Sequence, residues 1–513
     1  MNVEDAARHR CQVALGTEAR AALVASRLAL MRRLEAGEAM YGINTGFGSP
    51  RGSGSGSRGA SKRPAELVRL ARRGRGRVPA ARRRAGDHGR ARRGLARGVS
   101  GVRPECVDAI LGLLDHDIVP VVPSRGSVGA SGDLAPLAHI ALALIGEGRS
   151  SYAGVEGPTG KTMVACGLRP LVLEAKEGLA LINGTHLMTA IAALALCDLD
   201  RVAAAAVATA ALSIDACRAT DAFLDPRLHE ARRQPGQREV AARMRGLLEG
   251  STILPAHREH DPRVQDPYCL RAAPQVIGAA LDALAFTRDV VLRELGAVTD
   301  NPLVFAPVGG SPDEASAARH AGDACDVVSG GNFHGMPLAI ALDVAKIALA
   351  HVAGISERRV NWLLAASDSE NPVNAYLSPM PGLHSGLMIA QYAAAACCNE
   401  LQTLAHPASV HNITTSAGVE DYNSFGPTSA LHLRQSIELV ANVVAIELLV
   451  MTEAMEYQRP LRSGPRLEGV VAAVRDVVPK LVADRPPAPD IAAIARLVTS
   501  GRIAAASGGS ASA

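Results

Sequence analysis

The chain has 513 residues, of which 48% are hydrophobic and 3% aromatic, and its formal net charge is +4. This length allows a large buried core, and the scarcity of aromatic and β-branched runs predicts an all-α protein. The first ten residues hold four charged side chains and no apolar run, and later apolar runs are interrupted by charges before they reach membrane-spanning length. We therefore expect neither a secretory signal nor a membrane span, and we expect a cytoplasmic protein.

Nine cysteines occur without a CxxC pair and without regular spacing. This pattern predicts neither a zinc site nor a disulfide framework, and we expect reduced, mostly buried thiols. His257, His260 and Asp261 lie close together in the sequence. We interpret them as a solvated polar loop and expect no metal site.

An arginine-rich segment covers residues 51–97. It holds sixteen cationic side chains against Glu66 and Asp87, a local net charge of +14 that leaves −10 for the rest of the chain. Such a segment is typical of a disordered or nucleic-acid-binding arm, although no aromatic residue between Phe47 and Tyr152 offers a platform for base stacking. A third explanation is a reading-frame error, because residues 69–77 can be encoded so that a one-nucleotide shift yields Gly-Ser-His-Ala-Ala-Gly-Val-Gly-Glu.

Long apolar segments follow residue 98. Their apolar circumference predicts central helices of a bundle, and their ranges are 136–146, 176–217, 272–297, 337–356 and 384–405. A further helix is predicted by apolar residues at spacings of three and four, namely Leu433, Ile437, Val440, Val444 and Leu448. Strands are expected to be few and short.

The predicted connectors are rich in glycine, proline or polar residues, and they cover 120–133, 150–161, 250–267, 305–332 and 367–384. Loops on a rigid helical scaffold are where chemistry usually occurs. We divide the chain into an N-terminal region (1–200), a central helical bundle (201–480), and a C-terminal helix with a disordered tail (481–513).

The stretch GSVGASGDLAPL, residues 126–137, places Ala130, Ser131 and Gly132 directly before an apolar segment. Gly132 has no side chain to obstruct a tight bend, so its amide nitrogen could reach the carbonyl carbon of Ala130 and close a ring. Loss of water from that ring and from Ser131 would leave a conjugated methylene group, an electrophile that no ordinary side chain supplies. An isolated tripeptide of this kind would be an ordinary turn.

The tripeptide is not isolated, because its surroundings resemble the signature of the aromatic amino acid ammonia-lyases. Further blocks of the same resemblance occur in order along the chain: YGINTGFG (41–48), KEGLALINGT (176–185), RVQDPYCLRAAPQV (263–276), TDNPLVF (299–305), SGGNFHGMP (329–337), SGLMIAQY (385–392) and SAGVEDYNSFG (416–426). In that family Ala-Ser-Gly self-cyclises to 4-methylideneimidazol-5-one (MIO). The resemblance implies an all-α fold, with a long central bundle and a smaller N-terminal region that bears the MIO.

The resemblance implies roles for individual residues. Tyr41 matches the base that removes a β-proton, Asn183 an amide that contacts the MIO or the substrate amine, and Arg271 the group that holds the substrate carboxylate. Gln265 and Tyr268 precede Arg271 at intervals of three, so in a helix all three would line one pocket. We expect Tyr268 to act in catalysis and Gln265 to bind substrate. Phe333 resembles the aromatic wall beside the electrophile.

Glu420 is the residue most informative about specificity. Histidine ammonia-lyases place glutamate here, whereas phenylalanine and tyrosine lyases usually have glutamine, and a carboxylate can pair with an imidazole but not with a bare phenyl ring. The surrounding pattern departs from that of the histidine lyases, which reads closer to NQEDHVSMG, at Gly418, Val419, Tyr422 and Asn423. We therefore favour L-histidine as substrate and urocanate as product, and keep a phenylalanine or tyrosine lyase or an aminomutase as the alternative.

The family carries a helix and a loop similar to SHAAGVGE where this chain has its arginine-rich segment. We hypothesise that two compensating frame errors replaced about forty residues; if this chain is the true product, we expect a misfolded segment and low activity. The competing hypothesis is a catalytically impaired family member whose basic arm binds nucleic acid. We favour the ammonia-lyase over this nucleic-acid-binding hypothesis. The resemblance also implies a homotetramer with active sites shared between subunits.

Overall fold

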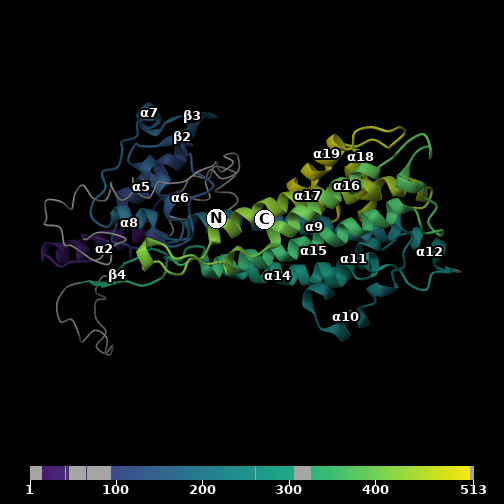
Figure 1. Ribbon diagram of the computed structural model, residues 1–513, viewed down its shortest axis with the longest axis horizontal. Helices are drawn as coiled ribbons and strands as arrows, with labels where there is room; N and C mark the ends of the chain where they lie inside the picture. The colour runs from purple at the N-terminus through teal and green to yellow at the C-terminus, as the bar shows by residue number, and fades with distance from the viewer. Residues whose placement is uncertain are drawn as a thin grey trace. The chain divides into compact units, whose positions relative to one another are not determined.

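The computed structural model describes residues 14–40, 42–44, 65, 94–259, 261–305 and 325–508. It is 62% helical with few strands, so the prediction of an all-α fold is confirmed (Figure 1). The chain divides into two compact units, which are described separately. Unit 1 comprises Met1–Leu194, Asp289–Ile340 and Ala408–Leu431, and unit 2 comprises Ala195–Arg288, Ala341–Pro407 and His432–Ala513.

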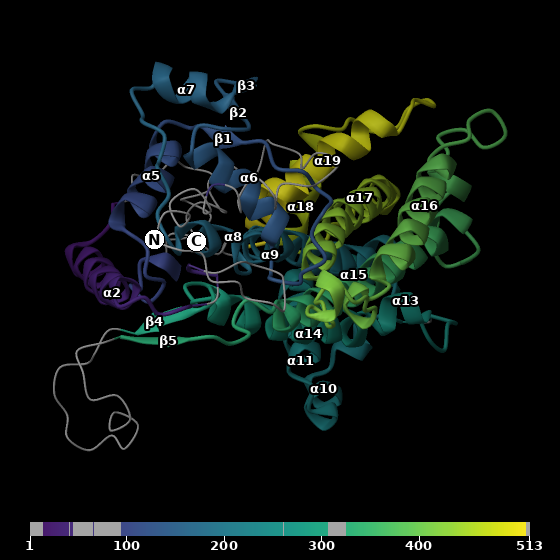
Figure 2. The ribbon, with the colours of Figure 1, turned by 60° about the vertical axis from the view of Figure 1, so that its left-hand side comes forward.

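Unit 1 combines short helices with two small sheets (Figure 2). Its helices are α2 (Thr17–Glu35), α5 (Pro104–Asp115), α6 (Leu134–Leu144), α7 (Thr159–Ala165), α8 (Glu177–Ile182) and the 3-10 turns η5 (Ala408–Val410) and η6 (Ser416–Gly418). An antiparallel sheet has the order β1 (Val119–Pro120), β2 (Arg149–Tyr152), β3 (Val155–Pro158). A second antiparallel pair joins β4 (Leu303–Phe305) to β5 (Asp326–Val328), with Leu303 opposite Val328.

Three helices supply most of the core of unit 1. α5 begins with Pro104 at its first turn, where the missing N–H costs nothing, and buries Ile110 and Leu113. α6 is apolar on nearly its whole circumference, as expected of a helix enclosed by others, and it packs against α8. The loop immediately before α6 therefore lies on a rigid base.

Unit 2 is a bundle of long helices with shorter helices around it. The long ones are α9 (His186–Ala216), α14 (Ala273–Glu294), α15 (Met336–Ala365), α16 (Met388–Ala405) and α17 (Gly426–Gln458). The shorter ones are η2 (Ala222–Leu224), α10 (Pro226–Arg232), α11 (Pro235–Leu248), α12 (Ile253–Arg258), α13 (Tyr268–Arg271), η4 (Ala375–Leu377), α18 (Pro465–Arg475), α19 (Ala488–Ser500) and α20 (Arg502–Ala506). The boundaries between the two units fall inside α9, α14, α15 and α17.

Small side chains and paired charges fill the interior of the bundle. The second half of the α9 helix buries several alanines, and small residues of this kind let neighbouring helices approach closely. Arg359 on α15 and Glu447 on α17 form an ion pair with no exposed side-chain surface. Ser356 also donates to the Glu447 carboxylate. These hydrogen bonds offset part of the cost of removing both charges from water.

One described helix, α15, is long and apolar enough to cross a membrane by length and composition alone. Its most apolar window is 67% buried within the protein, as is usual for a core helix. All eight cysteines among the described residues are free thiols; Cys106, Cys217 and Cys325 are buried and the others partly so.

The predicted helix over 176–217 is interrupted in the structure. It consists of α8 and α9, separated at residues 183–185. Asn183 ends α8 in an extended conformation, and Gly184 has a positive φ of 120° that other residues rarely adopt. This break places the NGT sequence (183–185) beside the Ala-Ser-Gly stretch, where Gly184 pairs with Gly132.

Candidate active site

The tripeptide Ala130–Gly132 forms a tight turn whose shape depends on glycine. Gly132 has φ +75°, and a Cβ at this position would lie 2.2 Å from the carbonyl oxygen of Gly184. Gly129 has φ +79°, and a Cβ there would lie 2.2 Å from Oγ of Ser424. Side chains are thus excluded on both sides of Ala130 and Ser131 by conformation and by space.

Gly184 holds the second half of this turn. Its N–H donates to the carbonyl of Ser131 (3.1 Å), and its carbonyl accepts from the N–H of Asp133 (2.8 Å). Ser131 is 7% exposed. The NGT break between α8 and α9 therefore serves as a short strand-like partner that fixes the tripeptide.

Asp133, directly after the tripeptide, connects the turn to the start of α9. The Oδ2 atom of this fully buried side chain accepts from the N–H groups of Leu187 (2.7 Å) and Met188 (3.1 Å). These donors belong to the first turn of the helix, where N–H groups lack helical partners and a negative charge is favoured. The carboxylate therefore fixes the turn against a long helix.

Asn183 presents an acceptor that the described residues leave unused. Its side chain is 3% exposed, and Nδ2 donates to the carbonyl of Asn301 (3.1 Å). Within the described part of the chain, the buried Oδ1 atom has no hydrogen-bond partner. A buried acceptor without a hydrogen-bond partner costs free energy, so its presence needs an explanation. One explanation is that a bound ligand supplies the donor.

A buried ion pair fixes the backbone of Asn301, which is the hydrogen-bond partner of Asn183. Lys176 Nζ lies 2.6 Å from Oδ2 of Asp300, and both side chains are almost completely buried. Burial lowers the pKa of Lys176, although Asp300 opposes this change. Oδ1 of Asp300 accepts from the N–H of Asn301 (2.6 Å), so the pair fixes the backbone to which Asn183 is bonded.

The glycine-rich loop 329–335 approaches the tripeptide through its backbone. The carbonyl oxygen of Phe333 would lie 3.0 Å from a Cβ on Gly132, and the Phe333 side chain is half-buried. His334 Nε2 donates to the carbonyl of Tyr422 (3.0 Å), and the two rings are stacked with centroids 6.4 Å apart. This loop therefore contacts both the tripeptide and the segment that carries Glu420.

Glu420 lies in a strained loop beside the turn. Thr415 Oγ1 donates to Oε2 of the half-buried Glu420 (3.0 Å), and the Thr415 N–H donates to its carbonyl (2.8 Å). Ser416, Ala417 and Phe425 all have positive φ values near 50°. Non-glycine residues rarely adopt this conformation, which clusters at functional sites.

The end of the same loop contacts the tripeptide turn directly. The N–H of Phe425 donates to the carbonyl of Val128 (3.0 Å), and Ser424 Oγ donates to the carbonyl of Gly129 (3.3 Å). Ser424 is fully buried. Four of the sequence blocks, around residues 130, 183, 333 and 420, are therefore assembled within unit 1.

Three predicted site residues lie in unit 2. The guanidinium carbon of Arg271 lies 4.5 Å from the ring centroid of Tyr268, a cation–π contact, and Arg271 Nε donates to the carbonyl of Asp266 (3.0 Å). Tyr268 is 72% exposed and Gln265 is also exposed. Because α13 begins at Tyr268, the helical interval applies to Tyr268 and Arg271 but not to Gln265. Tyr41 lies outside the described residues.

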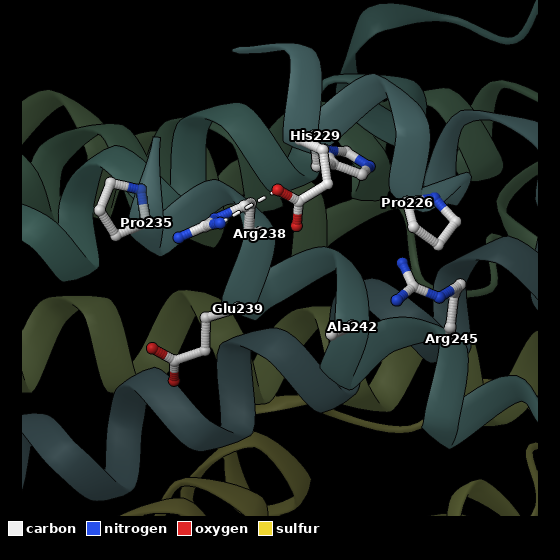
Figure 3. Close-up of a pocket in the computed structure, with 8 residues that line it drawn as sticks. Pro226, His229, Pro235, Arg238, Glu239, Ala242 and Arg245 are labelled. Carbon is white, nitrogen blue, oxygen red and sulfur yellow. Dashed lines mark hydrogen bonds and ion pairs between the residues drawn. The ribbon is translucent and has the colours of Figure 1, made fainter. Parts of the chain in front are cut away.

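Unit 2 also contains a surface hollow between α10 and α11 (Figure 3). Arg238 pairs with Glu230 across it (3.1 Å), and Arg245 donates to the carbonyl of Leu224 (2.6 Å). Its charges are mixed in sign and mostly satisfied within the protein, and no predicted site residue lines it. In the described ranges, no group of three histidine, cysteine or acidic residues could hold a metal ion.

Sequence reasoning missed Ser127, Asp133 and Ser424. Asp133 directly precedes α6, a position where a carboxylate often satisfies N–H groups, although here it satisfies those of α9 rather than those of the helix that follows it. Ser127 and Ser424 carried no signal in isolation, because their partners are backbone groups that only the fold brings near.

Comparisons with known proteins agree with this assembly of motifs. The family described as aromatic amino acid lyase matches residues 1–476. Histidine ammonia-lyase of Anaeromyxobacter dehalogenans (strain 2CP-C) is 44% identical over 514 residues, covering 96% of this chain and 95% of the relative. The chain belongs to the aromatic amino acid lyase family and is a carbon–nitrogen lyase.

Solved structures place the fold in the same family. Histidine ammonia-lyase from Trypanosoma cruzi matches with a TM-score of 0.87 and 34% identity, covering 99% of this chain and 92% of that one. Tyrosine aminomutase from Streptomyces globisporus matches with a TM-score of 0.88 and 31% identity, covering 98% and 95%. The fold alone therefore does not separate ammonia loss from amine migration.

Proposed function

We propose that this protein eliminates ammonia from L-histidine to give urocanate. The observation that carries the proposal is the glycine-dependent turn at Ala130–Gly132. Gly184 fixes this turn, and the neighbouring Asn183 has a buried Oδ1 with no hydrogen-bond partner among the described residues. Similarity to histidine ammonia-lyases over 96% of the chain supports the choice of substrate.

The MIO is the cofactor in this proposal, and the chain itself provides its atoms. The residues fit the group, since the left-handed Gly132 and the crowding around its Cα allow a tight backbone bend that a larger residue would prevent. Once formed, the ring supplies an electron-poor methylene carbon that accepts an amine. No external cofactor is needed for this chemistry.

The remaining roles belong to the chain's own side chains. Asn183 Oδ1 accepts a hydrogen bond from the substrate amine, which satisfies a buried atom that no described residue contacts by a hydrogen bond. By resemblance, Arg271 in unit 2 grips the substrate carboxylate, with Gln265 as a further substrate-binding residue, and Phe333 in unit 1 forms the aromatic wall beside the MIO. Tyr41 removes the β-proton, while Tyr268 assists in catalysis.

Glu420 selects histidine in this proposal. Glu420 is half-buried, and among the described residues its carboxylate accepts one hydrogen bond, from Thr415 to Oε2. The carboxylate can therefore still accept a hydrogen bond from an imidazole N–H. A bare phenyl ring would leave this carboxylate without its partner, at a cost in binding. The departures at Tyr422 and Asn423 are the specific observation that keeps a phenylalanine or tyrosine substrate as the second candidate.

Purified protein tested separately with L-histidine, L-phenylalanine and L-tyrosine decides among these activities. We expect histidine alone to give equal amounts of ammonia and a conjugated ultraviolet-absorbing acid. Product from phenylalanine or tyrosine instead would reverse the substrate assignment. A β-amino acid formed without free ammonia would identify an aminomutase.

We also propose a cytoplasmic homotetramer as the working form. Long helices of unit 2 leave large apolar side chains exposed, including Phe286 on α14, Ile347 on α15, and Ile389 and Tyr392 on α16, each between 41% and 59% exposed. Apolar surface of this kind usually marks an interface. Light scattering coupled to size exclusion should give the mass of four chains, and salt-sensitive retention on DNA or RNA would favour the basic-arm hypothesis.

A further inference from the structure

Ser127 spans the Ala-Ser-Gly tripeptide with a single hydroxyl group. Its Oγ accepts from the N–H of Gly129 (3.2 Å) and donates to the carbonyl of Gly132 (3.1 Å). We propose that Ser127 is a positioning residue for ring closure: it bends the backbone so that the Gly132 nitrogen approaches the Ala130 carbonyl carbon. This inference rests on the proposed function, because it concerns how the MIO forms.

The atoms that Ser127 holds take no part in the chemistry. Ring closure forms a bond from Gly132 N to Ala130 C; the Ala130 oxygen then leaves as water, with one proton from Gly132 N and one from Ser131 N. A second water takes the Ser131 hydroxyl and its Cα proton, leaving the methylene carbon. No oxidant or reductant is needed. The Gly129 N–H and Gly132 carbonyl stay outside the ring, so Ser127 can keep both bonds throughout.

The contacts around the turn divide into two sides that Ser127 links. On one side, Gly184 holds Ser131 and Asp133 through backbone bonds. On the other, Ser424 and Phe425 hold Gly129 and Val128. Ser127 bonds both to Gly129, directly before the tripeptide, and to Gly132, its last residue. Its removal would therefore leave the outer anchors in place while the bend between them relaxes.

This arrangement predicts slower ring closure rather than loss of the fold. Ser127 is half-buried, and its two hydrogen bonds are local, so Ser127→Ala should leave the helices intact. The two hydrogen bonds stabilise the bent backbone from which the ring closes. Their loss should therefore slow maturation by about tenfold or more. Ser127→Thr keeps the hydroxyl and should mature at the rate of the parent chain.

The test follows the mass of the tryptic peptide that covers residues 126–149, after denaturation at fixed times following synthesis. Maturation removes two waters, about 36 Da, from this peptide. Circular dichroism checks the fold of each variant, and Ser151→Ala removes another half-buried serine hydroxyl of unit 1, in β2, as the matched control. We expect unmodified peptide to accumulate only in folded Ser127→Ala.

Three results would bear differently on the two proposals. Full mass loss in Ser127→Ala at the parent rate overturns the positioning role and leaves the proposed lyase function intact. Equal delay in Ser127→Ala and Ser151→Ala also overturns it, because a general packing effect would then explain both. If the parent chain itself shows no loss of water, the proposed function fails first and the role of Ser127 fails with it.

Discussion

The side-chain amide of Asn183 donates to the backbone carbonyl of Asn301, 118 residues further along the chain, and leaves its own Oδ1 buried without a described partner. One half of the amide is thus used to fix its orientation. The other half is oriented but unused, as expected of a group that recognises a ligand.

Replacing Asn183 should therefore affect activity more than stability. Asn183→Ala removes one hydrogen bond to Asn301, worth about 1 kcal/mol, but also the proposed contact to the substrate amine, so we expect kcat/KM to fall about 10- to 100-fold. Initial rates with histidine and thermal unfolding measure the two effects.

Asn371 in unit 2 is the matched control for Asn183. Both ends of its buried amide are bonded, Nδ2 to the carbonyl of Ala216 and Oδ1 to Nε2 of Gln458. Asn371→Ala should lower the unfolding temperature more than Asn183→Ala while changing kcat/KM little. The opposite ranking would remove Asn183 from the site.

Glu420→Gln should weaken the preference for histidine. The variant keeps the size of the side chain and an oxygen that can accept from Thr415, but it replaces a charged hydrogen bond to imidazole with a neutral one. We expect kcat/KM for histidine to fall about 10-fold or more, with a smaller change for phenylalanine. Equal losses for both substrates would show that Glu420 does not distinguish the rings.

Asp215 should make stability depend on pH. Burial raises its pKa to about 6, although Ser251 and Ser463 donate to the carboxylate and oppose this effect. The folded pKa exceeds the ordinary unfolded value near 3.8. Protonation of Asp215 therefore contributes to the free energy of unfolding. This contribution is full below pH 3.8 and is lost as pH rises through 6, and its upper limit is about 3 kcal/mol.

Asp215→Asn should remove that dependence. We expect the variant to lose less stability than the parent chain between pH 4 and pH 7, as measured by denaturant unfolding at several pH values. Asp476→Asn, at a side chain 63% exposed beside Arg502, is the control and should follow the parent curve. Parallel curves for the parent chain and Asp215→Asn would contradict the assignment.

The arginine-rich segment predicts a result at the level of DNA. Residues 51–64 and 66–93 lie outside the described part of the chain. If two compensating frame errors replaced the family sequence, the DNA between the codons for Phe47 and Leu95 should encode a peptide similar to SHAAGVGE in a shifted frame. Sequencing that interval in the source DNA checks this, and the absence of such a peptide from every frame would end the hypothesis.

The helices were largely predictable, because their apolar periodicity is a local property of the sequence. The segment predicted at 136–146 is α6, and that predicted at 272–297 is α14. The interruption at 183–185 has only a weak local signal, the turn dipeptide Asn183–Gly184, because the apolar pattern continues on both sides of it. Its cause is a pairing between Gly184 and Gly132, 52 positions apart in the sequence, and no local pattern carries such information.

The site was predictable as a set of motifs but not as a network. Resemblance identified Ala130–Gly132, Asn183 and Glu420, and the interval between Tyr268 and Arg271 correctly placed one beside the other. The supporting groups Ser127, Asp133 and Ser424 could not be found in this way, since each acts on backbone atoms rather than on a recognisable partner side chain. The catalytic roles themselves stay predictions.

The placement of the unit boundaries has a practical consequence for expression. The chain passes between the two units five times, and four of these passages occur within the helices α9, α14, α15 and α17. No contiguous fragment contains one complete unit without parts of the other, and a truncation at any of the four would leave a helix with severed backbone hydrogen bonds. Half-molecules are thus poor candidates for recombinant production, and engineering must retain the whole polypeptide.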